Sequence, residues 1–324
     1  MLDIYITHYK EPWEVCRKQF LMLDLQRRVD WGEIRVTVIN DGGYRLPDEK
    51  LKELEFHWKA KEFRQLDIPH GGISRARNAG IEDATEPWIM FCDCDDCFSN
   101  IYALEDIMTV LKSGVEDRFD MLWTKVWEEM ENEVVMLIPD YRIFVFCHGK
   151  VYRREFLLEQ NLRFDERLTF NEDSCFNNVI FARVSNQRIG AIRSYSPVYT
   201  WIRRANSVTT SGREDEGTYC NFRRNLIVTE ENRLHRPDQY APMVTRTAYD
   251  AYFMSRMNKI TPSCKQKILE EFRPWIRERI GEFGMVLPET LDGILAISMD
   301  ELAEKKEQVT HKDVARWVRR QADG

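Results

Sequence analysis

The chain has 324 residues, of which 43% are hydrophobic and 12% aromatic, and its formal net charge is −7 at pH 7. This composition is typical of a globular protein and excludes a disordered one, while the acidic balance gives no general attraction for nucleic acid. No run approaches the ~18 continuous apolar residues that a membrane span needs. Residues 1–5 lack the basic and apolar regions of a secretory signal, so we expect a cytoplasmic protein without a transmembrane segment.

The first half of the chain alternates strand and helix patterns. One helix is expected after Pro12 and another over residues 71–84, and between them lie apolar runs typical of buried strands. These strands are expected at residues 2–7, 34–40, 63–68 and 88–92. This order predicts an α/β fold with a mostly parallel, doubly wound central sheet and flanking helices.

The pattern changes beyond Lys112. Two antiparallel strands are expected at 121–127 and 134–138, short helices at 152–160 and 173–183, and a last strand at 196–203. From about residue 215 the signals are mainly helical, separated by Pro237, Pro242, Pro262, Pro274 and Pro288. We therefore predict a catalytic-type domain at residues 1–212. For residues 213–324 we predict a helical region that serves either acceptor binding or oligomerisation.

Three carboxylates follow the strand at 88–92, in the segment Asp93-Cys94-Asp95-Asp96. Ligands of a parallel sheet bind at the carboxyl ends of its strands. Clustered carboxylates repel one another unless a positive charge joins them, and a hard divalent cation that also holds substrate phosphates suits such oxygen ligands. The alternative is that Asp96, Ser99 or Asn100 caps a helix at 101–112, which accounts for one aspartate and not for three.

Eight cysteines are scattered along the chain, and we expect reduced thiols in packed positions. Cys92, Cys94 and Cys97 are close enough to suggest a zinc site. However, no second C-x-x-C or nearby histidine pair completes four ligands.

Two glycine-containing segments also follow strands. Asp41 precedes Gly42-Gly43, and an aspartate there can accept hydrogen bonds from a base or ribose, although Asp-Gly is also the commonest of turns. Gly72 opens a helix that carries Arg75 and Arg77. Exposed N–H groups at a helix start and guanidinium groups both favour an anion; the alternative is a solvated helix face.

A second acidic pair, Glu172-Asp173, opens the helix at 173–183. The helix dipole favours the ionised carboxylate there, which suits a general base. Thr169 and Glu172 also fit the spacing of a capping box. Asp173 has no such structural duty.

These motifs together resemble the inverting family 2 glycosyltransferases of the GT-A fold. The resemblance covers about residues 1–212, in order: Asp41-Gly42, Gly72 to Asn78, Asp93-Cys94-Asp95-Asp96, and Glu172-Asp173. His148 to Phe156 looks like the lysine-tyrosine-arginine segment of the family, and Trp201 to Thr209 like the polar loop after its last strand.

The resemblance implies a metal-dependent inverting transfer from a nucleotide-sugar, expected to be a UDP-sugar, to an acceptor hydroxyl. Asp173 would be the general base with Glu172 beside it, and Asp93 and Asp95 would hold Mn²⁺ or Mg²⁺, Asp95 more directly. The donor-binding residues would be Thr7, Tyr9, Asp41, Gly72, Arg75, Arg77, Asp93 and Asp95.

The acceptor is expected to be a glycan, a cell-wall polymer or a lipid-linked sugar. Modified DNA is less favoured, because its only support is a basic tail formed by His311, Lys312, Arg316, Arg319 and Arg320. The helical region could also form a homo-oligomer. Two other functions are open: a nucleotidyltransferase, and a non-catalytic nucleotide-sugar or glycan-binding protein on the same scaffold.

Overall fold

The computed structural model describes residues 1–130, 135–137, 145–184, 188–194, 196–204, 212–302 and 309–324. They form two compact units. The first contains Met1–Arg167 and Glu172–Ser211, and the second contains Leu168–Asn171 and Gly212–Gly324.

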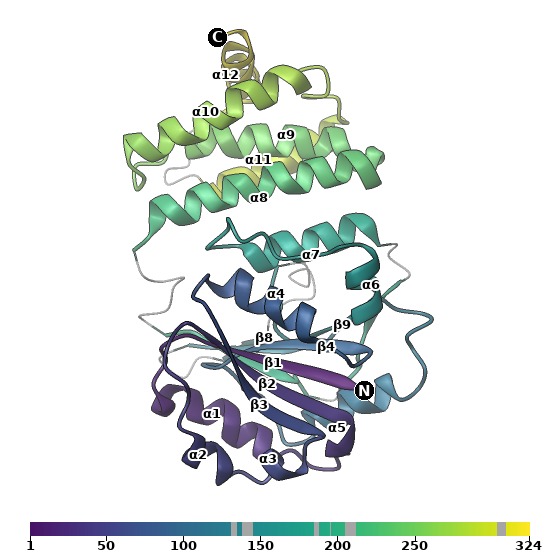
Figure 1. Ribbon diagram of the computed structural model, residues 1–324. Helices are drawn as coiled ribbons and strands as arrows, with labels where there is room; N and C mark the ends of the chain where they lie inside the picture. Colours follow the sequence, from purple (N-terminus) through teal and green to yellow (C-terminus); the bar gives the residue numbers. More distant parts are fainter. Residues whose placement is uncertain (131–134, 138–144, 185–187, 195, 205–211, 303–308) are drawn as a thin grey trace. The chain divides into compact units, whose positions relative to one another are not determined.

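The first unit is built on a seven-stranded sheet of order β10-β6-β9-β4-β1-β2-β3, of which β9, β4, β1, β2 and β3 are labelled in Figure 1. β1 is parallel to β2 and β4, β2 to β3, and β10 to β6, whereas β9 is antiparallel to its neighbours β4 and β6. The strands are β1 (Leu2–His8), β2 (Ile34–Asp41), β3 (Glu62–Ile68), β4 (Trp88–Asp93), β6 (Met121–Trp123), β9 (Lys150–Arg153) and β10 (Ile189–Ala191). The expected mostly parallel α/β sheet is confirmed.

Helices cover both faces of this sheet, because its central strands are apolar on both sides. Along β1, Ile4 and Ile6 face the core that includes α1 (Trp13–Asp24) and α5 (Ala103–Leu111). Tyr5 faces the opposite core. That core is closed by α4 (Ile73–Asp83), α6 (Arg154–Glu159) and α7 (Glu172–Arg183). The short helices η1 (Trp31–Glu33), α2 (Asp48–Lys52) and α3 (Phe56–Lys59) lie between β2 and its neighbours in sequence.

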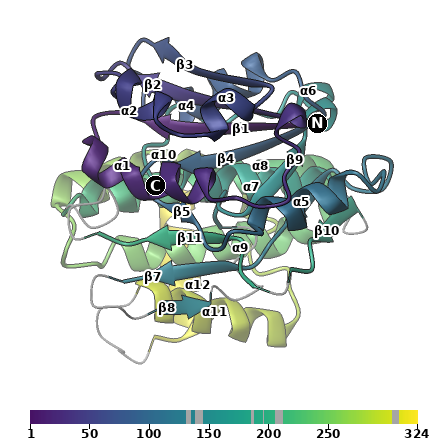
Figure 2. The same ribbon diagram turned by 90° about the horizontal axis from the view of Figure 1, so that it is seen from below.

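A second, four-stranded sheet has the order β5-β11-β7-β8, and Figure 2 labels its strands in this order. Its strands are β5 (Cys97–Phe98), β7 (Val126–Glu129), β8 (Val135–Leu137) and β11 (Tyr199–Ile202). β11 is antiparallel to β5 and parallel to β7, and β7 is antiparallel to β8. Pairing of β11 with β5 places Tyr199 opposite Phe98, in the segment that follows β4.

Two expectations for this unit were wrong in detail. Residues 150–153 form β9, so the helix expected at 152–160 begins only at Arg154. Residues 121–127 divide between β6 in the large sheet and β7 in the small one, and β7 alone pairs antiparallel with β8. β5, β9 and β10 have two to four residues each. Strands that short are stabilised by pairing with distant segments, which local sequence patterns do not report.

The second unit consists of helices around a core of its own. They are α8 (Glu214–His235), α9 (Pro237–Met254), α10 (Pro262–Arg279), α11 (Pro288–Leu302) and α12 (His311–Asp323). Three of the five prolines start a helix, where the missing N–H costs nothing, but Pro242 and Pro274 lie inside α9 and α10 and separate nothing. Among the described residues, none of the helices has the length and apolarity needed to cross a bilayer.

Candidate active site

β1 and β4 end side by side, so Thr7 at the end of β1 lies next to the acidic motif that begins with Asp93 at the end of β4. Thr7 is opposite Asp93 in the strand register, and its hydroxyl donates a hydrogen bond to Asp93 Oδ1 at 3.0 Å. The phenol oxygen of Tyr199, from the small sheet, accepts the backbone N–H of Asp93 at 3.0 Å. The carboxylate is therefore presented at the carboxyl edge of the large sheet, where an α/β fold binds its ligands.

Arg77 connects this strand end to α7. Its side chain is only 3% exposed. Nη2 donates to Asp93 Oδ1 at 3.0 Å and Nη1 to Glu172 Oε1 at 2.8 Å. Burial alone would lower the pKa of Arg77, but Asp93, Glu172 and Asp173 raise it overall, so the guanidinium stays charged. One buried cation thus brings the two acidic motifs into a single neighbourhood.

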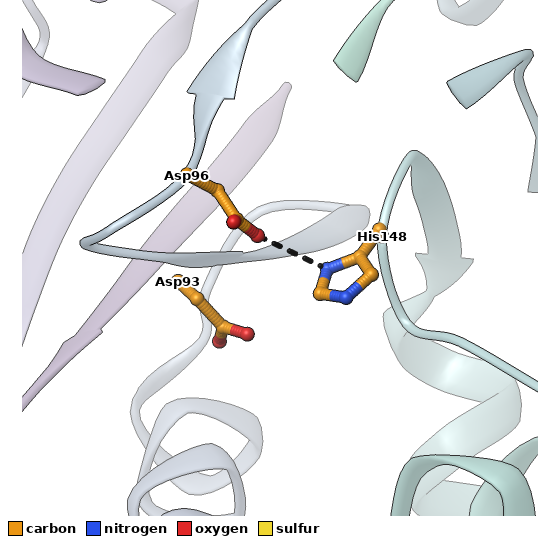
Figure 3. A group of neighbouring side chains, drawn as sticks. All are labelled: Asp93, Asp96 and His148. Carbon is orange, nitrogen blue, oxygen red and sulfur yellow. Dashed lines mark ion pairs between the residues drawn. The ribbon is translucent and has the colours of Figure 1, made fainter. Parts of the chain in front are cut away.

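Asp93, Asp96 and His148 form a cluster whose potential ligand atoms all lie within 4.8 Å of one another (Figure 3). Asp96 Oδ1 accepts the backbone N–H of Ile202 at 2.9 Å. Asp96 Oδ2 is buried, accepts no hydrogen bond from the described residues and lies 3.5 Å from His148 Nδ1. A buried oxygen in that condition is costly unless a cation or proton joins it.

The charges in this cluster are strongly perturbed. Burial and the neighbouring Asp93 raise the pKa of Asp96 well above its usual value. Burial alone would also raise the pKa of Asp93, but Arg77, His148 and Thr7 lower it overall. Burial lowers the pKa of His148 to about 4, so the imidazole is neutral at pH 7 and can act as a ligand. Its ring is held nearly parallel to that of Tyr199, with centroids 5.6 Å apart.

The aspartate expected to be the more direct metal ligand has a different partner. Asp95 is ion-paired with Arg204, which follows β11. Asp93 and Asp95, the two named metal ligands, therefore each contact an arginine. Asp96 was expected only as a third carboxylate of the motif, and His148 was not expected as a ligand. Asp96 does belong to the acidic motif, but no sequence signal connects it with His148, 52 positions later.

Asp173 lies in the first turn of α7 and is half-buried. Its Oδ1 accepts the backbone N–H of Ser174 at 2.7 Å. Burial and the adjacent Glu172 raise its pKa to about 7, against the opposing influence of Arg77 and Lys150. A carboxylate with such a pKa is suited to accept a proton near neutral pH.

Neither the capping box of Thr169 and Glu172 nor capping of α5 by Asp96 is present in the structure. Because α7 begins at Glu172, Thr169 lies three positions before its first residue and cannot cap it; its hydroxyl donates to Glu216 instead. Likewise α5 begins at Ala103, beyond the reach of Asp96. The acidic residues of both motifs are thus available for other roles.

At the end of β2, Asp41 is 4% exposed. Its carboxylate accepts the backbone N–H groups of Gly71 and Gly72, each at 2.8 Å, and a bond from His70 Nδ1 at 2.8 Å. Tyr9 stacks on His70 with ring centroids 4.2 Å apart. Sequence reasoning had not singled out His70.

Arg75, also expected at the donor site, lies in the first turn of α4. Its side chain is 47% exposed and comes within only 3.9 Å of Glu166. Arg75 is therefore held less tightly than Arg77, which is buried and makes two short ion pairs.

Comparison with known proteins gives a family-model match within the first unit and relatives that extend beyond it. Residues 3–159 match the family model for Glycosyl transferase family 2. An uncharacterized glycosyltransferase, EpsJ of Bacillus subtilis (strain 168), is 28% identical over 197 residues, 55% of each protein. Poly(ribitol-phosphate) beta-N-acetylglucosaminyltransferase TarS of Staphylococcus aureus (strain Mu50) is 24% identical over 81% of this chain and 46% of TarS. The chain spans about half the length of these relatives.

Two solved structures extend the likeness over 99% of this chain. S. aureus TarS 1–349 in complex with UDP superposes with a TM-score of 0.64 at 17% identity and is covered to 87%. Mannosyltransferase PcManGT from Pyrobaculum calidifontis, in complex with GDP-Man and Mn²⁺, gives 0.51 at 12% identity and is covered to 84%. Identities this low establish the fold alone, and they confirm the GT-A architecture.

Proposed function

The chain belongs to the family 2 glycosyltransferases, and from that premise we propose that it transfers a sugar from a UDP-sugar to an acceptor hydroxyl with inversion. One observation carries the proposal. Buried Arg77 contacts both Asp93, at the end of β4, and Glu172, next to Asp173. The group that would face the departing diphosphate and the group that would activate the acceptor are therefore neighbours, as a single displacement requires.

Asp173 is proposed to be the general base. Its Oδ1 is held by the backbone of Ser174, and a pKa of about 7 leaves a useful ionised fraction at neutral pH. It would take the proton of the acceptor hydroxyl while that oxygen attacks the anomeric carbon from the side opposite the diphosphate. A positioned base typically contributes about 10²–10⁴ in rate.

The residues at the end of β4 fit a divalent cation. Two carboxylates and a neutral imidazole converge in the cluster of Asp93, Asp96 and His148, and the buried Oδ2 of Asp96 accepts no hydrogen bond from the described residues. The carboxylate oxygens of Asp93 and Asp96 are ligands that suit Mn²⁺ and Mg²⁺. Such an ion, when bound, offsets the negative charge that builds on a departing diphosphate. Asp95 would join this set if Arg204 released it.

The other donor-binding roles remain proposals. Thr7 orients the Asp93 carboxylate, Gly72 opens α4 with its N–H already on Asp41, and exposed Arg75 would reach a phosphate. Tyr9 and Asp41 belong to the corner that would receive the base. UDP is proposed as the nucleotide because TarS has been solved with UDP and with UDP-GlcNAc.

For the acceptor we propose a hydroxyl of an anionic cell-wall polymer. TarS is named for poly(ribitol-phosphate), and GgaA of Bacillus subtilis, 28% identical over 149 residues, is a minor teichoic acid biosynthesis protein. In α12 the side chains of Lys312, Arg319 and Arg320 are exposed on one face, whereas Val314 and Val318 are buried in the core. A face of that charge suits a polymer of phosphodiesters.

The assay is incubation with Mn²⁺, UDP-GlcNAc or another UDP-sugar, and poly(ribitol-phosphate), followed by measurement of released UDP and of the anomeric configuration of the product. We expect UDP release that depends on the acceptor and a product with the configuration opposite to that of the donor. A retained configuration would refute the mechanism. Absence of transfer from every nucleotide-sugar tested would refute the activity. Transfer to DNA with modified bases, and not to poly(ribitol-phosphate), would refute the proposed class of acceptor.

The identity of the metal ligands gives a separate prediction. Asp96→Asn and His148→Ala should each weaken Mn²⁺ binding by about 10–100-fold, by analogy with the loss of other groups that organise a metal site. Titration of Mn²⁺ by calorimetry, with the unliganded protein of each variant, measures this directly. Asp95→Asn is the comparison: if it weakens binding more than Asp96→Asn does, the ion is held by Asp93 and Asp95 and the cluster in Figure 3 is not the site.

A further inference from the structure

Asn177 lies one helical turn after Asp173 on α7 and is 0% exposed. Its amide nitrogen donates to the backbone oxygen of Asp173 at 2.8 Å and to that of Phe146 at 3.1 Å. Its amide oxygen accepts the hydroxyl of Tyr152 at 2.9 Å. Because backbone oxygens can only accept, the nitrogen must lie on their side, and the orientation of the amide is fixed. A buried amide that is paired at both ends makes its surroundings rigid.

The partners of this amide come from separate elements of the first unit. Tyr152 belongs to β9, Phe146 to the segment before that strand, and Asp173 to the first turn of α7. The ring of Tyr152 is itself fully buried and packs edge-on against Phe176, with centroids 5.6 Å apart. β9 pairs with β4 on one side and β6 on the other. Asn177 therefore ties the start of α7 to a strand in the interior of the large sheet.

The segment at Phe146 also belongs to the surroundings of the metal cluster. Its backbone oxygen accepts Lys150 Nζ in addition to the amide of Asn177. His148 of the cluster in Figure 3 follows two residues after Phe146, and the two rings stack with centroids 5.7 Å apart. Asn177 is thus a second connection between the metal cluster and α7, separate from the one that Arg77 makes.

Asp173 has little to hold it through its own side chain. From the described residues its carboxylate accepts one hydrogen bond, that of the neighbouring Ser174 N–H at 2.7 Å. The first turn of a helix is also the part that frays, since its N–H groups lack intrahelical partners. A displacement of about 1 Å in a reacting group can cost ~10²-fold in rate. The base therefore depends on contacts made elsewhere on α7.

We propose that Asn177 is a positioning residue for the general base: by holding the backbone oxygen of Asp173, it keeps that carboxylate aimed at the acceptor hydroxyl. This inference rests on the proposed function, in which Asp173 takes the acceptor proton. Because Asn177 has no exposed surface, it does not touch donor or acceptor and acts only through Asp173.

Asn177→Ala should lower kcat for transfer to poly(ribitol-phosphate) by about 10–100-fold, the effect of a misplaced base. The affinities for UDP and Mn²⁺, measured by calorimetry, should stay within about twofold of wild type, as expected for groups that are not coupled. Lys150 still donates to the oxygen of Phe146, so the segment that carries His148 keeps a tie. Tyr152→Phe, which removes the hydroxyl and keeps the ring, should lower kcat by about 2–10-fold, the contribution of one hydrogen bond.

Both substitutions are then repeated in the Asp173→Asn background. If Asn177 acts only through the carboxylate of Asp173, its loss should change the residual rate by less than about twofold, because residues that act as a unit are not additive. A loss that is merely structural would instead reduce the residual rate by the same factor as in wild type. That result would overturn the proposal.

Asn178→Ala is the matched control. Asn178 makes the same bond one position along α7, from Nδ2 to the backbone oxygen of Ser174 at 2.8 Å, and its loss should leave kcat at the wild-type value. Thermal melting shows whether each variant is folded, and Tyr152→Phe carries the comparison if Asn177→Ala is not. A folded Asn177→Ala with wild-type kcat, or with UDP affinity reduced as much as kcat, would also refute the role. If wild type releases no UDP with any acceptor, the proposed function itself fails, and this inference with it.

Discussion

Replacing Asp173 by Asn should lower the turnover number for sugar transfer by about 10²–10⁴-fold, the usual contribution of a positioned general base. The amide is nearly the same size and can still accept the N–H of Ser174, but it cannot take a proton at neutral pH. Binding of UDP should change little, because the role proposed for Asp173 is toward the acceptor. Steady-state kinetics with saturating donor and calorimetry with UDP separate the two effects.

The pH dependence gives the same residue a second test. Burial and Glu172 raise the pKa of Asp173 to about 7. Only the ionised form can accept the proton, so the wild-type rate should rise with pH through about 7 and level off above it. The residual rate of Asp173→Asn should lack that rise. Asp117→Asn, at an exposed position of the same unit, is the control and should retain both the rate and the profile. A wild-type rate that falls through pH 7 would contradict the assignment.

Replacing Arg77 by Ala should destabilise the protein by about 3 kcal/mol, which is in the range for breaking a buried ion pair by removal of one partner. Two carboxylates, Asp93 and Glu172, would lose the cation between them. The pKa of Asp93 would then rise, since Arg77 is the strongest influence that lowers it. Transfer activity should also fall, because the end of β4 and the start of α7 would no longer be tied together.

Arg75→Ala is the matched control for this effect. It lies on the same helix but is 47% exposed, with its nearest carboxylate 3.9 Å away. Such a surface contact contributes about 0–1 kcal/mol. Urea denaturation of the two variants should therefore show a clear difference in the free energy of unfolding. Equal stabilities would mean that the contacts of Arg77 are not an organising element of the site.

The central architecture followed from the sequence because it depends on local patterns. β1, β2 and β4 are continuous apolar runs, and strands buried on both faces belong to parallel sheets. β9 was missed because the four residues Lys-Val-Tyr-Arg do not suggest a buried strand. Their strand structure depends on β4 and β6, which pair with them from both sides.

For the candidate site, the sequence indicated the motifs but not the contacts that their side chains make. The motifs containing Asp93, Arg77 and Asp173 could be found in the sequence, and the structure brings them into one neighbourhood. What each side chain contacts could not be found, because it depends on segments far away in sequence. His148 approaches Asp96 from a turn before β9, and His70 Nδ1 lies 2.8 Å from Oδ2 of Asp41, 29 positions earlier. Those pairings are set by register and loop closure rather than by composition.

The position of β9 has a consequence for synthesis on the ribosome. β1 to β4 are complete by residue 93, but the strand that pairs with the free edge of β4 ends only at residue 153. At about 5–20 residues per second, the nascent chain would display that apolar edge for roughly 3–12 s. An unpaired strand edge is a template for aggregation, so the nascent polypeptide should recruit chaperones most strongly while residues between 93 and 153 are being translated.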